Sequence, residues 1–371
     1  MSQNPSTPRP SSTTLARPGR KVRVLVVDDS AVIRNLLVRN LGNDPDIEVV
    51  GTASDPYLAR DAILALTPDV MTLDVEMPRM DGVTFLKKLM PQHPLPVVMV
   101  STLTVAGGEK TLEALASGAV DFIGKPLKAD PAALAALVTE LRAKVKAAAL
   151  VDVKRFMRSA SAPRPTGIAA PLRAVDNRSG TRVIAIGSST GGVEALSEVI
   201  PRLPPGTPPV LIVQHMPKEF VSILARRLGE RSQLRVREAI DGEMLAPGTV
   251  YVGPGGRHLT LTGSGDQLRV RLDDSPAVAG GHRPAVDNLF RSVAERCGAR
   301  AIGVILTGMG KDGAEGLLAM RKAGARTIAQ DAASCVVFGM PREAIALDAA
   351  QQVKPLGQMA DTIVRLVGGE K

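Results

Sequence analysis

Three carboxylates, a lysine and a hydroxyl follow strand-like runs in the first third of the chain. Asp28 and Asp29 end the run VRVLVVDD, and Asp74 is the residue before last of PDVMTLDV. Ser101 and Lys125 follow two later runs. Because the carboxyl ends of parallel strands meet at one edge of a sheet, we expect these side chains to lie close together. Clustered carboxylates repel one another unless a cation lies among them, and oxygen ligands suit Mg²⁺. A carboxylate beside Mg²⁺ and a lysine can accept a phosphoryl group, and the serine can donate to the product.

Helix capping is the simpler explanation for a single aspartate at the end of a strand. It accounts for Asp28 or Asp29 alone. It does not account for Asp74 together with Ser101 and Lys125. We therefore favour a metal-assisted phosphoryl site with the three aspartates as metal ligands.

A second set of candidate residues begins at the segment Val183–Gly192, which reads VIAIGSSTGG. A dinucleotide fingerprint would need glycine at the position of Ser189, and no Lys-Ser/Thr pair follows as in a Walker A loop. The segment does fit G-x-S-x-G, in which a turn between a strand and a helix exposes a serine. This pattern is short and common, so alone it is weak evidence for a nucleophilic serine.

A nucleophilic serine needs a base, and the base needs an acid that orients it. The chain has four histidines: His93 in the first domain, His258 in a hairpin strand, His282 in a loop, and His215 at the end of the run VLIVQH. Only His215 follows a strand in the same way as Ser189. A lone histidine is more often structural, but this placement favours His215 as the base.

A third strand end lies in AIGVILTGMGKDG, where Asp312 opens a helix after a glycine-rich loop. An N-cap role explains Asp312 in isolation. With Ser189 and His215 it completes a Ser-His-Asp set, in a chain order that differs from that of α/β-hydrolases. Glycines let backbone N–H groups point at a ligand, so we expect the N–H groups of Met309 and Thr190 to form an oxyanion hole.

The elements that position the first set alternate between strands and helices. Five strand-like runs each precede a helical run, which predicts a doubly wound parallel α/β sheet. We expect this first domain at residues 21–140, after a disordered tail at residues 1–20 that is rich in Ser, Thr and Pro.

The alternation breaks at residues 151–181 and then restarts, and we set the linker at residues 141–181. That stretch is rich in Pro, Ser, Gly and Arg, which predicts a flexible basic linker. Residues 182–371 predict a second, larger and mainly parallel α/β domain. Its residues 234–272 contain several short strands with Gly and Pro turns, which we expect to form hairpins beside the main sheet.

Composition and charge exclude several classes of protein. The net charge of +9 lies in the tail, which has three Arg and no acid, and in residues 142–182, which have ten Lys/Arg and two Asp. Only 2% of residues are aromatic, so few side chains can stack on bases and we expect no nucleic-acid partner.

No apolar run approaches the ~20 residues of a membrane span, and the N-terminus lacks an apolar signal segment. The two cysteines form no CxxC pair, so we expect a cytoplasmic protein without membrane insertion.

The motifs VLVVDDS, DVEMPRMDG, VMVST and FIGKP occur in this order between residue 22 and about residue 140. They resemble the receiver domain of two-component response regulators. The resemblance implies a five-stranded flavodoxin-like fold in which a histidine kinase of the chemotaxis type phosphorylates Asp74. It also implies that the three aspartates hold Mg²⁺, that the lysine and serine engage the phosphoryl group, and that Phe122 is the switch aromatic.

The motifs IAIGSSTGG, QHMP, GHRPAVDNLF and ILTGMGKDGAEGL occur between about residues 182 and 368. They resemble the catalytic domain of the chemotaxis protein-glutamate methylesterases, the CheB type. The resemblance implies that Ser189 is the nucleophile, His215 the base and Asp312 the orienting acid. It also implies that methyl-accepting chemoreceptors are the substrates and that their glutamines are deamidated. Ser188 stands where we expect alanine, and we expect Ser189 to attack.

These features together predict an esterase for glutamate γ-methyl esters, with Mg²⁺ needed at the receiver and no cofactor needed for hydrolysis. The order of receiver, linker and esterase suggests that the receiver covers the catalytic edge until Asp74 is phosphorylated. The main alternative is a phosphorylation-controlled binding module, which would not need a Ser-His-Asp set. A DNA-binding response regulator would have a short helix-turn-helix output domain, and the second domain is too long and too rich in strands for that.

Overall fold

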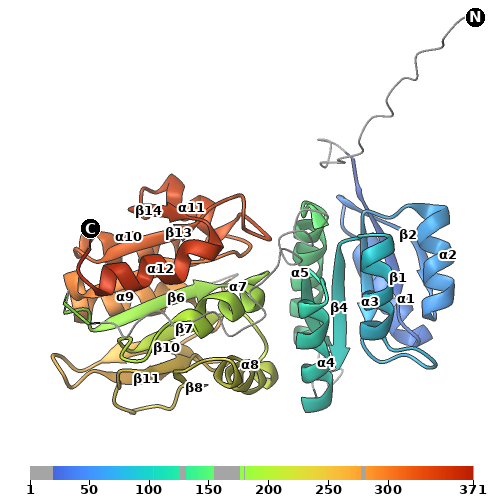
Figure 1. Cartoon of the computed structure of the whole chain (residues 1–371). Helices are drawn as coiled ribbons and strands as arrows, with labels where there is room; N and C mark the ends of the chain where they lie inside the picture. Colours follow the sequence, from blue (N-terminus) through green and yellow to red (C-terminus); the bar gives the residue numbers. More distant parts are fainter. Residues whose placement is uncertain are drawn as a thin grey trace, which may run out of the picture.

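The chain folds into two α/β domains (Figure 1). The structure is a computed structural model that describes residues 20–102, 104–125, 131–153, 176–178, 180–276 and 281–370. Nearly all of the expected tail and most of the expected linker lie outside these residues. Within the described part of the chain, no helix is long and apolar enough to cross a membrane.

The first domain is a five-stranded parallel sheet in the order β2-β1-β3-β4-β5, as expected for a receiver. Its strands are β1 (Val22–Val27), β2 (Ile47–Ala53), β3 (Val70–Asp74), β4 (Val97–Thr102) and β5 (Asp121–Lys125). Its helices are α1 (Ala31–Gly42), α2 (Pro56–Leu66), α3 (Gly82–Gln92), α4 (Val105–Ala116) and α5 (Pro131–Ala148).

The local sequence explains where these elements begin. All five residues of β3 are buried, as a central parallel strand with helices on both faces requires. A polar side chain caps four of the helices by accepting a backbone N–H from the first turn, which satisfies a donor that the helix leaves free. These caps are Ser30, Asp55, Asp81 and Thr104.

Helix α5 extends the first domain beyond residue 140. It ends at Ala148, and the side chains of Leu141, Val145 and Ala148 are buried. The boundary expected at residue 140 therefore lies inside a helix that packs into the core. The part of the expected linker at residues 154–175 lies outside the described residues.

The second domain is built on a seven-stranded parallel sheet in the order β14-β13-β12-β6-β7-β9-β8. Its strands are β6 (Val183–Ser188), β7 (Val210–Gln214), β8 (Arg235–Glu238), β9 (Thr249–Val252), β12 (Ala301–Ile305), β13 (Arg326–Gln330) and β14 (Gln352–Lys354). The main helices are α7 (Gly192–Val199), α8 (Lys218–Glu230), α9 (Val286–Cys297), α10 (Ala314–Lys322), α11 (Met340–Ala346) and α12 (Leu356–Val367). A separate antiparallel hairpin pairs β10 (His258–Thr262) with β11 (Arg269–Asp273).

The expectation of hairpins throughout residues 234–272 is correct only for β10 and β11. Strands β8 and β9 join the main sheet instead, and β9 pairs in parallel with both β7 and β8. Their short length hid this role, because four residues carry too little periodicity to distinguish a hairpin arm from an edge strand.

The two domains pack against each other through α4 of the first and through α7 and α8 of the second (Figure 1). Phe122 in β5 lies against Phe220 in α8, with ring centroids 4.7 Å apart, and both side chains are buried. Gly108 allows α4 to approach α8 closely, because a Cβ at this position would lie 2.4 Å from Cδ1 of Ile223. At the exposed rim, Arg226 forms an ion pair with Glu109 at 2.6 Å.

Candidate functional site

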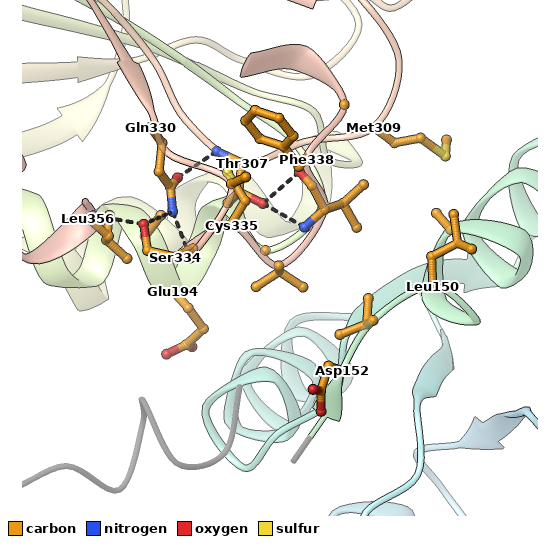
Figure 2. Close-up of a pocket in the computed structure, with 18 of the residues that line it drawn as sticks. Leu150, Asp152, Glu194, Thr307, Met309, Gln330, Ser334, Cys335, Phe338 and Leu356 are labelled. Atoms are coloured by element: carbon orange, nitrogen blue, oxygen red, sulfur yellow. Dashed lines mark hydrogen bonds between the residues drawn. The ribbon is translucent and has the colours of Figure 1, made fainter. Parts of the chain in front are cut away.

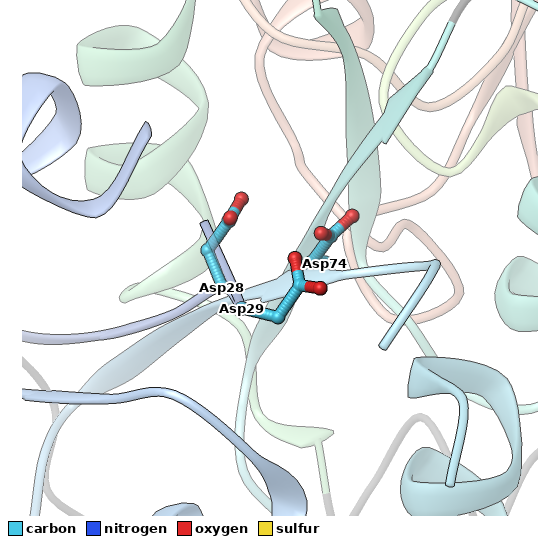
Figure 3. Close-up of side chains that lie close together, drawn as sticks. All are labelled: Asp28, Asp29 and Asp74. Carbon is cyan, nitrogen blue, oxygen red and sulfur yellow. The ribbon is translucent and has the colours of Figure 1, made fainter. Parts of the chain in front are cut away.

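The three aspartates expected to bind a metal lie together at the carboxyl edge of the first sheet (Figure 3). Asp28 and Asp29 follow β1, and Asp74 ends the neighbouring strand β3. One carboxylate oxygen from each residue lies within 4.8 Å of the other two. Asp28 and Asp74 are buried and Asp29 is exposed, so the cluster is open to solvent on one side. This set of oxygen donors fits Mg²⁺, which binds one or two carboxylates and keeps several waters.

Lys125 lies between two of these carboxylates. Its Nζ is 2.8 Å from Oδ2 of Asp28 and 2.8 Å from Oδ2 of Asp74. Burial raises the pKa of Asp74 to about 6, although the neighbouring lysine opposes the rise. Burial alone would lower the pKa of Lys125, but the two carboxylates outweigh burial and the pKa rises. The lysine thus partly offsets the charge of the aspartates, as a phosphoryl-binding cation would.

Ser101 is buried at the end of β4, the strand next to β3. Its hydroxyl donates to the backbone oxygens of Thr102, at 3.3 Å, and Gly107, at 3.4 Å. In this structure Ser101 is therefore bonded to the start of α4, which connects this edge of the sheet to the helix that packs on the second domain.

The second candidate set is also assembled at the carboxyl edge of a sheet. Strands β12, β6 and β7 are neighbours in that order. Ser189 follows β6, His215 follows β7, and Asp312 lies in the segment between β12 and α10. The strand-end argument from the sequence therefore gives the correct relative placement of these three residues.

Asp312 and His215 form a direct hydrogen bond. Nε2 of His215 is 2.8 Å from Oδ2 of Asp312. The same carboxylate accepts the backbone N–H groups of Val286, at 2.8 Å, and Asp287, at 2.9 Å, at the start of α9. Burial alone would raise the pKa of Asp312, but the hydrogen bond and charge of His215 and these two N–H groups lower it. The carboxylate is thus held ionised.

Asp312 does cap a helix, but the helix is α9 and not α10, which follows it in the sequence. Helix α10 begins after Gly313 and has no side-chain cap, whereas the Asp312 carboxylate accepts the first N–H groups of α9. Asp287 in turn accepts the N–H of Gly316 at 2.6 Å, which ties α9 to α10. One carboxylate therefore both caps a helix and orients the histidine.

His215 has one ring nitrogen left for a serine. Because Nε2 is bonded to the carboxylate of Asp312, its proton lies there and the lone pair lies on Nδ1. Nδ1 is buried and has no hydrogen-bond partner among the described residues. The ring also stacks on that of His282, with centroids 3.8 Å apart and an interplanar angle of 21°. This orientation makes Nδ1 the candidate general base.

Gln214 holds the loops of Ser189 and His215 together. Its Nε2 donates to the backbone oxygens of Ser189, at 2.9 Å, and His215, at 3.0 Å. The N–H of His215 also donates to the backbone oxygen of Ser188 at 3.1 Å. The backbone of Gly192 lies against the side chain of Gln214, because a Cβ on Gly192 would lie 2.0 Å from Oε1 of Gln214.

The structure distinguishes the two adjacent serines. Ser188 is fully buried, and its hydroxyl donates to Oε1 of Gln214 at 2.7 Å. The Ser189 hydroxyl makes no hydrogen bond to the described residues, and Ser189 as a whole residue is 9% exposed. Ser188 therefore serves the scaffold, and Ser189 is the candidate nucleophile.

The expected oxyanion donors lie in two loops that are bonded to each other. The N–H of Ser189 donates to the oxygen of Thr307 at 3.1 Å, and the Thr307 hydroxyl donates to the oxygen of Thr190 at 3.0 Å. A Cβ on Gly308 would lie 2.8 Å from Cβ of Ser189, so the loop before Met309 approaches the serine closely. The N–H groups of Thr190 and Met309 have no acceptor among the described residues, as an oxyanion hole requires.

Comparison with known proteins identifies the family of each domain. A family model described as CheB methylesterase matches residues 184–363, and one described as response regulator receiver domain matches residues 24–139. A protein-glutamate methylesterase/protein-glutamine glutaminase of Anaeromyxobacter dehalogenans is 53% identical over 95% of this chain and 97% of its own length. The chain belongs to the CheB methylesterase family.

Other relatives give the same result. A protein of the same description from Syntrophotalea carbinolica is 51% identical over 94% of this chain and 98% of its own length. The crystal structure of the Thermotoga maritima CheB methylesterase catalytic domain is 42% identical to this chain, covers 50% of it and 98% of that domain, and gives a TM-score of 0.49. The two family models identify the first domain of this chain as a receiver domain and the second as a methylesterase domain.

The receiver domain directly contacts the candidate esterase site. The hydroxyl of Thr190 donates to Oδ2 of Asp121, the first residue of β5. Asp121 also pairs with the buried Lys144 at 3.2 Å, and Lys144 pairs with Glu140 at 2.9 Å. Burial alone would lower the pKa of Lys144, but the two carboxylates raise it, so it remains charged. A buried ion network of the receiver therefore ends on a residue next to Ser189.

A cavity of about 1120 Å³ separates the domains beside this contact (Figure 2). Gly191, Thr307 and Met309 line it from the methylesterase domain, and Leu150 and Asp152 line it from the receiver domain. The cavity therefore reaches the loops next to Ser189 through Gly191 and Met309, but Ser189, His215 and Asp312 do not line it.

The sequence reasoning missed three functional contacts. Gln214 precedes the candidate base, but its sequence position did not show that it bonds both loops. His282 was assigned to a loop, and its stacking on His215 depends on how that loop folds back. Asp121 belongs to the other domain, so its contact with Thr190 had no signal in the local sequence.

Proposed function

We propose that this chain is a phosphorylation-regulated serine esterase that hydrolyses glutamate γ-methyl esters on methyl-accepting chemoreceptors. The activity is that of its family, whose members carry the description protein-glutamate methylesterase/protein-glutamine glutaminase. The hydrogen bond from His215 to Asp312 is the main support for the residues that we assign to catalysis. Ser189, with its free hydroxyl, follows the neighbouring strand. We place the reaction in the cytoplasm.

Hydrolysis begins when Nδ1 of His215 takes the proton of the Ser189 hydroxyl and the oxygen attacks the ester carbonyl. Asp312 keeps the ring in the required tautomer and stabilises its charged form. The N–H groups of Thr190 and Met309 donate to the oxyanion, and each donor contributes about 3 kcal/mol in a comparable site. The intermediate collapses, and methanol leaves with the proton that His215 returns.

Water then completes the cycle. His215 takes a proton from water, the hydroxide attacks the acyl-serine, and the serine oxygen recovers its proton as the glutamate carboxylate leaves. The same steps on a glutamine side chain release ammonia in place of methanol, which accounts for deamidation at the same site. None of these steps uses a metal ion or an organic cofactor.

The receiver domain accepts a phosphoryl group at Asp74 from a histidine kinase of the chemotaxis type. The P–N bond of the phosphohistidine breaks, a P–O bond to the carboxylate forms, and the histidine nitrogen keeps the bonding electron pair. Asp28, Asp29 and Asp74 would hold Mg²⁺, which when bound offsets charge on the transferring oxygens. Lys125 supplies a second positive charge at the same place, within 2.8 Å of Asp74.

The phosphoryl site is connected to the esterase site through the interface between the domains. Ser101 is bonded to the start of α4, and α4 packs on α8. Phe122, the proposed switch aromatic, lies against Phe220 of α8. A phosphoryl group that draws Ser101 and Lys125 toward Asp74 would disturb both contacts. We infer that phosphorylation releases the receiver from the catalytic edge.

Methanol release from a methylated receptor tests the assignment of the nucleophile. Ser189→Ala is expected to lose methanol release almost completely, because the neighbouring hydroxyls that the structure describes, those of Ser188, Thr190 and Thr307, are hydrogen-bonded. Ser188→Ala is the matched control, since it removes a hydroxyl one residue away and is expected to retain most of the activity. Equal rates for wild type and Ser189→Ala would overturn the serine mechanism.

A further inference from the structure

A groove between α2 and α3 of the receiver domain has no part in the chemistry described above. It has a volume of about 470 Å³. The buried side chains of Ile63, Phe85 and Leu89 form its floor, and Tyr57 and Leu64 stand at its rim. Tyr57 is 48% exposed and Leu64 is 65% exposed. Large apolar side chains exposed beside an apolar groove mark a site of protein interaction.

The charged side chains that line this groove are basic. The residues that line it include Arg60 and Lys88 and no Asp or Glu. Lys88 has no anion within 4.0 Å among the described residues, and Arg60 pairs only with Asp61, its neighbour in sequence. An apolar floor with two exposed cations fits an acidic amphipathic helix, whose apolar face fills the groove and whose carboxylates meet the cations.

One end of the groove lies beside the phosphorylation edge. Met80, which lines the groove, belongs to the segment that connects Asp74 with α3. Arg79 in that segment pairs with Asp55 before α2 at 3.0 Å, and its guanidinium lies 5.5 Å from the centre of the Tyr57 ring. A helix bound along the groove would therefore have one end close to Asp74.

The opposite side of the receiver is not free in this structure. Helix α4 and strand β5 contact the methylesterase domain through Gly108, Phe122 and Asp121. Helix α2 lies at the other side of the receiver, away from that domain (Figure 1). In the closed chain the groove between α2 and α3 therefore stays accessible to a phosphodonor, whereas the face of α4 and β5 does not.

We propose that this groove docks an acidic amphipathic helix of the histidine kinase that phosphorylates Asp74. The kinase can then bind the closed chain without displacing the methylesterase domain. The inference rests on the proposed function, in which a kinase is the phosphodonor, and it adds the surface and the chemistry of recognition.

The test compares two phosphodonors on the full chain. Purified chemotaxis-type histidine kinase from the same organism is autophosphorylated with ATP, and its transfer to the chain is timed. Acetyl phosphate, which needs no docking surface, is the second donor. The groove variants are Leu64→Glu and Lys88→Glu, both surface changes that oppose an acidic helix. Val32→Glu is the control, because Val32 is 76% exposed on α1 outside the groove.

We expect kcat/KM for transfer from the kinase to fall about tenfold or more in each groove variant, because each places a carboxylate against an acidic helix. Labelling by acetyl phosphate should stay within about twofold of wild type, which also shows that the variants are folded. If Leu64→Glu loses labelling by both donors, that variant is misfolded. The result for Lys88→Glu then decides whether the groove is the docking site.

Normal kinase transfer in the groove variants would overturn the groove as the docking site, as would an equal loss in Val32→Glu. These results leave the proposed function intact. Wild type that accepts phosphoryl from neither donor would overturn the proposed phosphorylation and this inference with it.

Discussion

The hydroxyl of Thr190 donates to the carboxylate of Asp121, which joins the residue after the candidate nucleophile to the receiver domain. Asp121 is fixed in turn by Lys144, which is buried and also donates to the backbone oxygen of Phe122 at 2.6 Å. The backbone N–H of Thr190 is a proposed oxyanion donor. The receiver therefore contacts the candidate esterase site at a residue that we propose as an oxyanion donor.

Thr190→Val is expected to raise the basal esterase activity of the unphosphorylated chain. The change removes the donor to Asp121 and keeps the backbone N–H. Hydrogen bonds to charged groups contribute about 1.5–3 kcal/mol, so the equilibrium between closed and open chains should shift by about tenfold or more. Methanol release without a phosphodonor measures the effect. The same change in a chain of residues 181–371 is the control, and a similar rise there would show that the effect does not come from the receiver.

Gly108→Leu is expected to separate the domains and raise basal activity in the same assay. A side chain at this position would collide with Ile223 of α8, where even a Cβ would lie 2.4 Å from Cδ1. Gly42→Leu at the end of α1 is the matched control, since a Cβ there meets nothing within 4 Å. Basal activity that is unchanged in Gly108→Leu would mean that close packing of α4 on α8 does not restrain the esterase.

Asp312→Asn is expected to lower both activity and stability. The loss of the carboxylate removes the group that sets the tautomer of His215, which costs about three to four orders of magnitude in kcat in comparable triads. It also removes the charged cap of α9, which contributes about 1 kcal/mol to the free energy of unfolding. Ser189→Ala should lose activity without this loss of stability. Denaturant unfolding of the two variants separates the effects, and equal stability would contradict the capping role.

The stability that Asp312 contributes should disappear in acid. Its pKa in the folded chain is lowered, because the bonds from His215, Val286 and Asp287 outweigh burial. A carboxylate with a lowered pKa adds stability above its unfolded pKa, near 3.8, and loses it as the pH falls through the folded value. The difference in unfolding free energy between wild type and Asp312→Asn should therefore be full at pH 5 and shrink below pH ~3.8. A difference that stays constant from pH 5 to pH 3 would contradict this.

Much of the fold and of both sites follows from the sequence, because parallel sheets place successive strand ends at one edge. That rule was enough to bring Ser189, His215 and Asp312 to one edge of the second sheet, and Asp28 and Asp74 to one edge of the first. It does not show how two domains dock, so the contact between Thr190 and Asp121 was not predictable. Short edge strands such as β8 were also misplaced, since their partners are set by tertiary packing.

The two adjacent serines show the same limit. The G-x-S-x-G pattern puts Ser189 at the position of the nucleophile, and the family resemblance agrees, but neither shows what the hydroxyl of Ser188 does instead. The structure supplies a physical reason, because Gln214 accepts the hydroxyl of Ser188 and leaves that of Ser189 free. The role of Gln214 depends on a buried side-chain contact across two strands, which sequence spacing does not encode.

The most direct test of the whole account is the rate of methanol release from a methylated receptor, with and without acetyl phosphate and Mg²⁺. The account predicts that the phosphodonor raises the rate of the wild-type chain, leaves that of Asp74→Asn unchanged, and has no effect on Ser189→Ala, which releases almost no methanol. A wild-type rate that does not respond to the phosphodonor would contradict control of the esterase by the receiver.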